Sequence, residues 1–359
     1  MKREGSQLEQ TNHTNNQQPL VQIKHLAKHF QIKGGGLLKR ETKTLKAVDN
    51  VSLTIYKGET LGLVGESGCG KSTLGRNVLR LQEPTNGEVL FHGEDILTYS
   101  KKQLREIRND MQIIYQDPFG SLNPRFTIGE SIGEMFKIHG LYKGKEREEK
   151  VKELLELVGL DTSRYDSYPH EFSGGQRQRV GIARALALNP EFIVADEPVS
   201  ALDVSVQSQI INLLMKLKAE FGLTLLFIAH GLNVVRHISD RVGVMYLGQI
   251  VELSDTDQIF DRPAHPYTAA LLSTVPDPNP DARKNRIVLE GEVPSPASPP
   301  SGCRFRTRCP LATEQCKQVE PKLQEIRSGH FVSCHYPLQE GQSLHEAIAT
   351  MQDKEKVRA

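Results

Sequence analysis

The early part of the chain alternates apolar and polar positions in short runs, which Gly, Pro or Asp interrupt. Residues 21–30, 46–55 and 87–96 show this pattern most clearly. Alternation with a period of two is typical of strands that have one face on a core and the other face in water. The pattern therefore predicts an antiparallel sheet in this part of the chain.

A second kind of run is short, nearly continuous and apolar, and it leads into a glycine or a charged residue. Residues 59–65, 191–198 and 223–230 are of this kind, which is typical of strands in a parallel sheet that is buried on both faces. Each run precedes a segment with helical spacing, and these segments are Lys71–Leu81, Val204–Phe221 and Leu232–Ile238. The alternation of strand and helix predicts an α/β core.

Residues 127–160 show helical spacing and no strand signal. Val151, Leu154, Leu155 and Val158 fall on one face of a helix, as expected where that face packs on a core. We therefore expect a helical insertion in the α/β domain, with a helical subdomain over about residues 117–170.

Both ends of the chain differ in composition from the middle. Residues 1–19 are rich in Asn, Gln and Thr and contain no aromatic residue, so we expect a flexible tail there. After Tyr267 the chain becomes dense in proline. We expect a globular domain over residues 20–264, a small appended domain over residues 265–340 and a second tail over residues 341–359.

Charge and hydropathy argue against several classes of protein. Lys and Arg number 45 against 44 Asp and Glu, a formal net charge of +1, which disfavours a chain that coats nucleic acid or anionic lipid. Hydrophobic residues make up 38% of the sequence, and no apolar run reaches the roughly 18–20 residues that span a bilayer. The polar N-terminus lacks the apolar region of a secretory signal. We therefore expect a chain that neither spans nor crosses a membrane.

One loop carries a phosphate-binding motif. Residues 65–72, Gly-Glu-Ser-Gly-Cys-Gly-Lys-Ser, match G-x-x-x-x-G-K-[ST] at every fixed position, between a predicted strand and a predicted helix. Glycines let successive backbone N–H groups converge on phosphate at a helix N-terminus. Lys71 brings positive charge to the β- and γ-phosphates, and the hydroxyl of Ser72 is placed to ligate Mg²⁺. A chance glycine turn is the alternative, which the strand–loop–helix context disfavours.

Two carboxylates follow another buried strand. Asp196 and Glu197 end the apolar run that begins at Phe192, about 125 residues after the phosphate loop. The carboxyl ends of parallel strands form the edge of the sheet where ligands bind. We expect Asp196 to hold Mg²⁺, directly or through water, and Glu197 to polarise the water that attacks the γ-phosphate. On its own such a pair is usually just a solvent-facing strand end, so its interpretation depends on the phosphate loop.

Further motifs occur in a fixed order around these two. Residues 172–176, Phe-Ser-Gly-Gly-Gln, resemble the signature motif of the ATP-binding-cassette (ABC) ATPases. Gln116 resembles the glutamine of that family's Q-loop, and residues 200–203 resemble its D-loop. His230 resembles its switch histidine, and Phe30 is placed like the aromatic residue on which adenine stacks. A single SGGQ string would be a weak signal, but the whole set in order is specific.

The resemblance implies the ABC fold, with an α/β phosphate-loop core of the RecA-like type, an antiparallel β subdomain and an α-helical subdomain. It also implies that two cassettes close head to tail on two ATP molecules, so that each site combines one chain's phosphate loop with the other chain's signature. The candidate catalytic residues are then Glu197 and His230. The candidate Mg²⁺ ligands are Ser72, Gln116 and Asp196. The candidate ATP-binding residues are Phe30, Gly65, Glu66, Ser67, Gly68, Cys69, Gly70, Lys71, Ser72, Thr73, Gln116, Ser173, Gly174, Gly175, Gln176 and Asp203.

Two positions depart from the common pattern of this family. Phe172 stands where Leu is usual, which changes packing rather than chemistry. Gly231 follows His230 where Asp is frequent, which leaves the imidazole in place. Cys69 occupies a free position of the phosphate loop, where we expect it to fill space. Because Glu197 and His230 are both present, we expect the chain's own phosphate-loop site to be competent for hydrolysis.

Three strings in the C-terminal region narrow the resemblance to one group within the ABC ATPases. Residues 265–268 (His-Pro-Tyr-Thr), 291–296 (Gly-Glu-Val-Pro-Ser-Pro) and 302–310 (Gly-Cys-Arg-Phe-Arg-Thr-Arg-Cys-Pro) look like the extension of the oligopeptide/dipeptide and nickel importer ATPases. This resemblance implies the ATP-hydrolysing subunit of a peptide importer at the cytoplasmic face of the cell membrane. The implied partners are a second, related cassette in a heterodimer, two membrane-spanning permease subunits and, indirectly, an extracytoplasmic peptide-binding protein, with no nucleic acid.

Two other functions stay open at this point. A soluble ABC ATPase of DNA repair or translation usually carries two cassettes in one chain, a long coiled-coil insertion or a basic surface. This sequence has one phosphate loop and a net charge of +1. An importer for nickel or heme would differ from a peptide importer only in its partners, because the cassette itself does not touch the substrate.

Four of the five cysteines crowd together near the C-terminus, with the spacing C-x5-C-x6-C-x17-C, at Cys303, Cys309, Cys316 and Cys334. A metal can hold together a segment that is too small for a core of its own. Zinc sites favour C-x₂₋₄-C pairs, whereas wider and uneven spacing suits a cubane cluster. The resemblance points the same way, because ATPases of this family are thought to hold a 4Fe–4S cluster there. Zinc, or four reduced cysteines packed as small apolar groups, are the alternatives.

Overall fold

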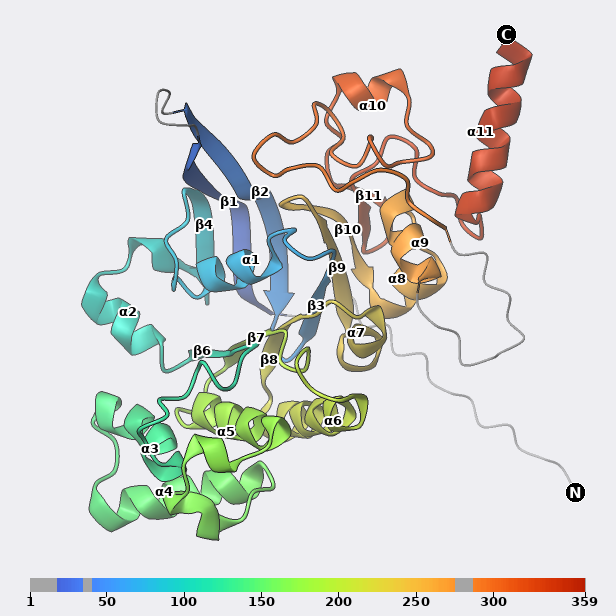
Figure 1. Cartoon of the computed structure of the whole chain (residues 1–359). Coiled ribbons are helices and arrows are strands. Elements are labelled where there is room, and N and C mark those ends of the chain that lie inside the picture. Colours follow the sequence, from blue (N-terminus) through green and yellow to red (C-terminus); the bar gives the residue numbers. More distant parts are fainter. Residues whose placement is uncertain (1–17, 35–40, 275–286, 359) are drawn as a thin grey trace, which may run out of the picture.

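Two β-sheets form the centre of the computed structural model, which describes residues 18–34, 41–274 and 287–358 (Figure 1). The strands are β1 (Pro19–Gly34), β2 (Glu41–Tyr56), β3 (Thr60–Val64), β4 (Asn86–Phe91), β5 (Glu94–Asp95), β6 (Met111–Ile114), β7 (Phe192–Asp196), β8 (Thr224–Ile228), β9 (Arg241–Tyr246), β10 (Gln249–Asp255), β11 (Gln324–Arg327) and β12 (His330–Val332). The tail predicted for residues 1–19 lies outside the described residues, apart from its last two positions.

Helices cover both sheets and build the two ends of the molecule. The α-helices are α1 (Lys71–Val78), α2 (Lys101–Ile107), α3 (Ile128–His139), α4 (Gly144–Leu157), α5 (Gly174–Leu186), α6 (Val204–Phe221), α7 (Leu232–Ile238), α8 (Thr256–Asp261), α9 (Pro266–Ser273), α10 (Glu314–Gln318) and α11 (Leu344–Arg358). Short 3₁₀ helices are η1 (Ile96–Thr98), η2 (Thr162–Asp166) and η3 (Pro169–Glu171). Among the residues that the structure describes, none of the helices combines the length and the apolar character that a membrane span needs.

The larger sheet has the strand order β11-β12-β10-β9-β3-β8-β7-β6. Its parallel centre consists of the strands predicted to be parallel, since β3 pairs with β8 and β8 with β7, and that prediction is confirmed. The strands β9 and β6 continue the parallel pairing on either side. Every residue of β3, β7 and β8 is buried. These strands run in one direction, so their last residues lie at the same edge of the sheet, where the candidate site lies. These residues are Val64 of β3, Asp196 of β7 and Ile228 of β8.

The smaller sheet has the order β2-β1-β4-β5, and its pairs are antiparallel, as predicted. The alternating side chains of β1 and β2 pack on the α/β core, because one face of each strand is apolar. Val21 and Ile23 of β1 share a buried cluster with Leu61 of β3 and Leu74 of α1. This contact holds the antiparallel sheet against the start of the phosphate loop.

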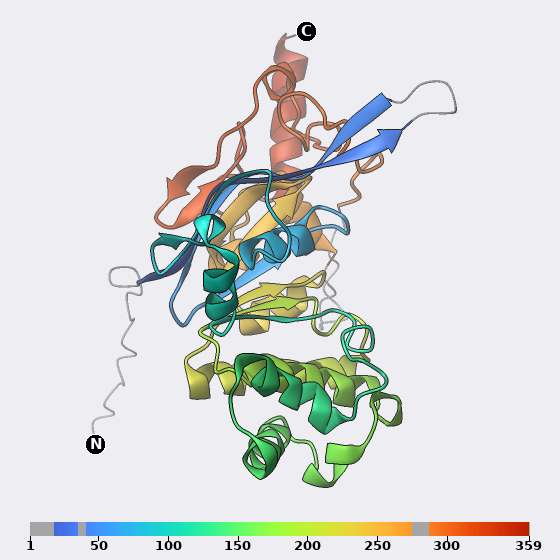
Figure 2. The same cartoon turned by 90° about the vertical axis from the view of Figure 1, so that its left-hand side faces the viewer.

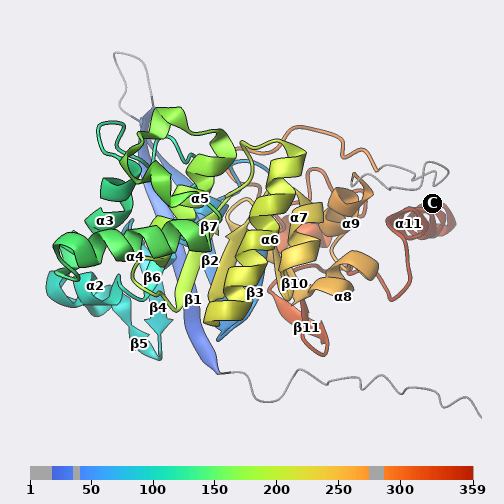
Figure 3. The same ribbon diagram turned by 90° about the horizontal axis from the view of Figure 1, so that it is seen from below.

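The predicted helical insertion is present as α3, α4, η2 and η3. Its buried face contains Ile132 and Phe136 of α3 together with Val151 and Leu155 of α4. Figure 1 and Figure 2 place α3 and α4 at one end of the molecule, with the C-terminal segment around α10 and α11 at the other end. Seen from below, α5 and α6 lie side by side across one face of the larger sheet (Figure 3).

The C-terminal segment is the part of the chain from residue 265 onward, of which the structure describes residues 265–274 and 287–358. Its strands β11 and β12 extend the larger sheet. β12 pairs with β10 through Glu252↔Val332 and Leu253↔Phe331. The segment predicted to be a tail at residues 341–359 contains α11, and its Leu344 is buried. The strands β6, β9, β10, β11 and β12 also lie outside the predicted set of strands. Of these, β6, β11 and β12 have four residues or fewer, so that periodicity alone gives little signal for them.

Candidate active site

The phosphate loop connects the buried strand β3 to α1. Its glycines take backbone conformations that other residues rarely adopt, with φ of 153° at Gly65, 76° at Gly68 and 108° at Gly70. A side chain at Gly70 would also collide with the chain, because a Cβ there would lie 2.0 Å from the carbonyl oxygen of Ala47. Gly70 is the N-cap of α1 and adds no side-chain cap. The loop therefore directs backbone N–H groups toward a ligand at the helix N-terminus.

Lys71 lies beneath this loop and is almost fully buried, with 3% of its surface exposed. Its ammonium group donates to the carbonyl oxygens of Gly65, at 2.8 Å, and Glu66, at 3.2 Å. Cys69 is buried beside it, with Sγ 3.8 Å from the Lys71 ammonium. The structure thus holds a desolvated cation inside the loop, where it is available to phosphate oxygens. Ser67 and Gly68 are exposed at the tip of the loop, and Thr73 is half-buried in α1.

The first metal-binding candidates meet across the edge of the sheet. The Ser72 hydroxyl donates to Oδ1 of Asp196 at 2.6 Å, although the two residues are 124 positions apart. Asp196 is buried, and its Oδ2 lies 3.6 Å from a guanidinium nitrogen of Arg76. A hydroxyl and a carboxylate are oxygen ligands of the kind that Mg²⁺ prefers. The donor set therefore fits Mg²⁺.

Glu197 connects the remaining catalytic candidates. Its Oε1 lies 2.6 Å from Nε2 of His230, and its Oε2 accepts from the Gln116 amide at 2.8 Å. The carboxylate is buried, whereas His230 is 42% exposed. The backbone of Glu197 takes φ of 51°, which is unusual for a side chain with a Cβ. The three residues come from the ends of β7 and β8 and from the segment after β6, so the sheet topology brings them together.

The signature residues form a separate surface in this chain. Ser173 caps α5 in a capping box with Gln176, so α5 begins at Gly174. Ser173, Gly174 and Gln176 are exposed, while Gly175 is buried against Val206 of α6. The hydroxyl and backbone N–H groups at this helix N-terminus suit an anion.

Two further ATP-binding candidates lie at the edges of this arrangement. Asp203 is the exposed N-cap of α6, in the loop that lies against the start of α5. Phe30 is half-buried in β1, where it pairs with Leu45 and has the ammonium of Lys28 5.1 Å from its ring centroid. Their contacts with nucleotide stay predictions.

Comparison with known proteins identifies the family. Residues 48–200 match the family described as ABC transporter, and residues 251–316 match the family described as Oligopeptide/dipeptide transporter, C-terminal region. Over 323 residues the chain is 56% identical to the oligopeptide transport ATP-binding protein AppF of Bacillus subtilis, an alignment that covers 89% of this chain and 98% of that protein. The chain belongs to the ABC transporter family. It is therefore an ABC-type ATPase.

Other relatives of this ABC ATPase support the same family assignment. It is 54% identical over 319 residues to the oligopeptide transport ATP-binding protein OppF of Salmonella typhimurium, which covers 88% of this chain and 95% of that protein. Among solved structures, the dimeric bacterial ABC transporter cassette MJ0796 matches with a TM-score of 0.58 and 33% identity, over 66% of this chain and 99% of that chain. A second structure of MJ0796, described as a dimeric post-hydrolysis state bound to ADP and Pi, matches equally well. The fold class expected from the sequence is confirmed.

The four C-terminal cysteines of the ABC ATPase are free thiols that lie near one another. The pKa of Cys309 is raised to about 12, mainly by burial and to a smaller extent by the neighbouring thiols of Cys303 and Cys316. Burial likewise raises the pKa of Cys334, with added contributions from the other three thiols. The backbone N–H of Cys303 donates to the carbonyl of Cys316 at 2.7 Å. Within the described ranges, however, the structure contains no group of three His, Cys, Asp or Glu side chains arranged to hold a single metal ion.

The contacts that join the C-terminal segment to the phosphate loop were not predicted from the sequence. The guanidinium of Arg308 forms an ion pair with the carboxylate of Glu66, and the backbone N–H of Glu66 donates to Oη of Tyr267 at 3.0 Å. Tyr267 and Arg308 lie in two of the strings singled out in the sequence, residues 265–268 and 302–310, but neither string reveals which residues it contacts.

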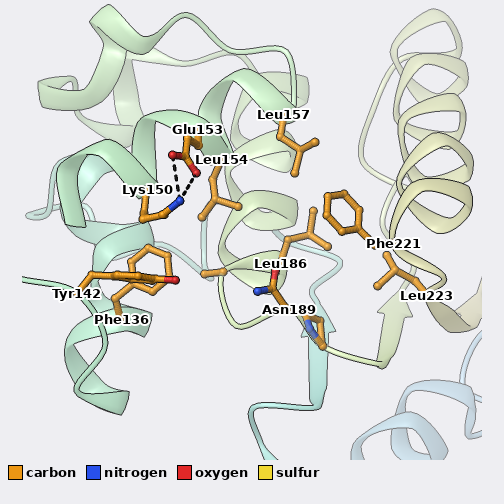
Figure 4. A pocket seen from close by; sticks show the side chains of 12 residues that line it. Phe136, Tyr142, Lys150, Glu153, Leu154, Leu157, Leu186, Asn189, Phe221 and Leu223 are labelled. Atoms are coloured by element: carbon orange, nitrogen blue, oxygen red, sulfur yellow. Dashed lines mark hydrogen bonds and ion pairs between the residues drawn. The ribbon is translucent and has the colours of Figure 1, made fainter. Parts of the chain in front are cut away.

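Two hollows lie near these elements. One, of about 280 Å³, adjoins the phosphate loop and is lined by Gly65, Glu66, His230 and residues of α7 and α9. The other, of about 380 Å³, lies between the helical insertion and the α/β core (Figure 4). Its lining is largely apolar, with an ion pair between Lys150 and Glu153 at its rim. The second hollow contains no residue of the phosphate loop, so it is separate from the nucleotide site.

Proposed function

We propose that this ABC ATPase energises the import of oligopeptides or dipeptides through membrane-spanning permease subunits. The names of the relatives, both oligopeptide transport ATP-binding proteins, support the substrate class. The single observation that supports hydrolysis at this chain's own site is the placement of Glu197. Its carboxylate is held between Gln116 and His230, one residue after the Asp196 that contacts Ser72.

In the proposed reaction, the phosphate loop and Lys71 bind the β- and γ-phosphates of ATP. Ser72, Asp196 and Gln116 are the proposed Mg²⁺ ligands, and the bound ion would neutralise phosphate charge. The Glu197 carboxylate orients the attacking water and accepts its proton. His230 and Gln116 keep that carboxylate in position. A shift of Gln116 toward the metal would therefore also move Glu197, which links nucleotide binding to the helical insertion.

We propose that a second, related cassette completes the site in a heterodimer. Support comes from the exposed helix N-terminus at Ser173 and Gly174, together with the exposed Asp203. An exposed serine hydroxyl and backbone N–H groups that face solvent are suited to the phosphates of a nucleotide held by the partner. Phe30 is the proposed platform for adenine. The proposed location is the cytoplasmic face of the cell membrane, against two permease subunits that receive peptide from an extracytoplasmic binding protein.

The experiment that tests the function is Glu197→Gln in the assembled transporter. Gln keeps the size of the side chain but does not take a proton from water, so we expect ATP hydrolysis to fall by 100-fold or more, on the order of 3 kcal/mol in the barrier. Binding of a fluorescent ATP analogue should stay within about threefold of wild type, and peptide uptake into proteoliposomes should stop.

The matched control is Glu191→Gln, which changes a surface carboxylate that pairs with Lys57 just before the same strand β7. This variant should hydrolyse ATP and transport peptide as wild type does. A Glu197→Gln transporter that turns over at a near wild-type rate would overturn the assignment of the base. A transporter that hydrolyses ATP without moving any peptide would overturn the substrate class.

We also propose that the four C-terminal cysteines hold a 4Fe–4S cluster, with zinc as the alternative. The convergence of Cys303, Cys309, Cys316 and Cys334 supports a shared group, and the raised pKa of Cys309 means that this thiol needs a cation to ionise. Thiolates bound to separate irons also tolerate a wider spread than ligands of one ion. Such a cluster would have a structural role, because it would hold together a segment with little core of its own.

Anaerobic purification followed by iron and sulfide analysis and a visible spectrum tests this cluster. We expect about four irons and four sulfides per chain, a brown colour and loss of that colour in Cys309→Ser. Cys69→Ser is the control, because Cys69 lies in the phosphate loop and should leave the colour unchanged. A colourless protein that contains zinc, or no metal, would rule the cluster out.

A further inference from the structure

We propose that the C-terminal segment holds the phosphate loop in its ATP-binding shape, with Arg308 as a positioning residue that sets nucleotide affinity. The inference rests on the proposed binding of ATP at residues 65–72. It goes further by giving this segment a defined effect on that site. Two contacts reach residue 66 of the loop directly, and a chain of contacts that begins at Arg304 reaches residue 69.

The first contact is the ion pair between Arg308 and Glu66. Nη1 of Arg308 lies 3.0 Å and 2.8 Å from the two carboxylate oxygens of Glu66, across 242 positions of sequence. The Arg308 side chain is 9% exposed and that of Glu66 is 24% exposed, so the pair is largely shielded from water. The phosphate-loop motif places no demand on the side chain at this position. A charged pair there therefore needs a reason outside phosphate chemistry.

The second contact fixes the backbone of the same residue. The N–H of Glu66 donates to Oη of Tyr267, a fully buried residue of α9, at 3.0 Å. The carbonyl oxygen of Glu66 in turn accepts from the ammonium of Lys71 at 3.2 Å. Glu66 is thus held at its carboxylate and its N–H by the C-terminal segment, and at its carbonyl by the lysine that binds phosphate. A movement of Arg308 or Tyr267 would displace the carbonyl that positions Lys71.

A chain of contacts that begins at Arg304 reaches the far side of the loop. This guanidinium is buried and donates to the carbonyl of Leu247 and to the carboxylate of Asp49. The residue after Leu247, Gly248, donates its N–H to the carbonyl of Cys69 at 2.9 Å. The C-terminal segment therefore supports the loop at residue 66 directly and at residue 69 through one turn of the β9–β10 connection.

Aromatic packing makes this support rigid. Phe305, which lies between the two arginines in sequence, is buried with ring centroids 5.3 Å from Tyr246, 5.3 Å from Tyr267 and 5.7 Å from His265. Buried rings in such edge and tilted arrangements add packing energy beyond the area they bury. The segment thus behaves as one unit, and its arginines are not free to follow the loop.

The electrostatic consequence is specific to the charge of Glu66. A carboxylate in the phosphate loop repels the triphosphate unless a cation neutralises it, and in a shielded site that repulsion is stronger than in water. Removing one partner of a shielded pair leaves an uncompensated charge, whereas removing both leaves none. Arg308→Ala should therefore weaken ATP binding, and adding Glu66→Gln to it should restore binding.

The test is equilibrium titration of the full-length chain with a fluorescent ATP analogue. We expect Kd to rise on the order of tenfold in Arg308→Ala and to return to within about threefold of wild type in the double variant. In the assembled transporter, KM for ATP should rise in Arg308→Ala while kcat at saturating ATP is unchanged. The control is Arg306→Ala, because Arg306 lies in the same segment but donates to Ser301.

Two results would overturn the inference. The first is an Arg308→Ala chain that binds ATP as tightly as Arg306→Ala does. The second is a double variant as weak as Arg308→Ala, which would show that the arginine acts on folding of the segment and not through the charge of Glu66. A wild-type chain that binds no ATP would instead contradict the proposed function, so the two failures are distinguishable.

Discussion

The buried ammonium of Lys71 shows how a single side chain can be prepared for the phosphate that we propose it binds. Lys71 is 3% exposed and is held by two loop carbonyls, so the desolvation of the cation and the ordering of its four-carbon stem are already complete before phosphate arrives. A charge-assisted contact with phosphate then adds to a site that needs little rearrangement. The same burial makes the lysine hard to replace.

We predict that Lys71→Ala weakens ATP binding by 100-fold or more, because the triphosphate loses its main cationic partner in a shielded site. Equilibrium titration with a fluorescent ATP analogue measures this loss. Lys57→Ala is the matched control, since Lys57 forms an exposed pair with Glu191. Nearly equal affinities of the two variants would mean that Lys71 does not bind the phosphates.

Two of the three glycines in helix α5, Gly175 and Gly181, have very different surroundings. A Cβ at Gly175 would lie 2.4 Å from Cγ1 of Val206 in α6, whereas a Cβ at Gly181 meets nothing within 4 Å. Gly175 therefore permits the close approach of the signature helix to α6. No close contact requires a glycine at position 181, where glycine makes the helix less stable than alanine would.

We predict opposite effects of alanine at these positions. Gly175→Ala should destabilise the protein by about 1–3 kcal/mol, because a well-packed contact must open. Gly181→Ala should stabilise it by up to about 1 kcal/mol. The midpoints of urea unfolding, followed by circular dichroism, measure both changes. A Gly175→Ala protein as stable as Gly181→Ala would show that the two helices do not need this contact.

Helix α9 begins with a histidine cap that should respond to pH. Nδ1 of His265 accepts from the backbone N–H of Tyr267 at 3.0 Å, and complete burial lowers the pKa of His265 to about 4. Since the unfolded chain holds that proton up to a pKa of about 6.5, acid favours unfolding. The contribution of this residue is complete above about pH 6.5 and is lost as the pH falls toward 4.

We predict that His265→Asn loses less stability between pH 7 and pH 5 than wild type does, by about 2 kcal/mol. Asn keeps a cap acceptor without titrating in this range. Thermal melting at a series of pH values provides the measurement. His25→Asn, at an exposed position of β1, is the control and should melt with the pH dependence of wild type. Identical pH profiles for His265→Asn and wild type would contradict the prediction.

At the scale of the whole molecule, the C-terminal segment is part of one sheet and one core. β12 pairs with β10, and His330 lies 2.7 Å from Glu252 with both side chains fully buried. The boundary expected between residues 264 and 265 stays a prediction, but the sheet continues across it. Removal of the segment would expose the edge of β10 and leave Glu252 without its partner.

We predict that a chain shortened to residues 1–264 melts lower than the full chain, on the order of 10 °C, and aggregates when concentrated. Removal of residues 341–359 alone should cost much less, because α11 is buried mainly at Leu344 and Ala347. Differential scanning fluorimetry and size-exclusion chromatography compare the three chains. A chain of residues 1–264 that melts within a few degrees of full length would show that the cassette folds independently.

Local patterns were enough to predict the nucleotide site and the elements that carry it. A phosphate loop is a contiguous string of glycines, a lysine and a serine, and strands and helices repeat with short periods, so a sequence displays both directly. The bounds of α6 and α7 were predicted correctly for this reason. Asp196 and Glu197 were found because parallel strands bring their carboxyl ends to one edge.

Only the tertiary structure decided which distant residues meet. The pairing of Arg308 with Glu66, the approach of Arg304 to Leu247 and the addition of β12 to the sheet depend on the path of the whole chain. A run of arginines does not indicate which carboxylate each of them pairs with, because the two partners of an ion pair can lie at any separation in the sequence. The sequence by itself therefore determined which residues we propose for the chemistry of the ATP site, and the tertiary structure determined which distant residues support them.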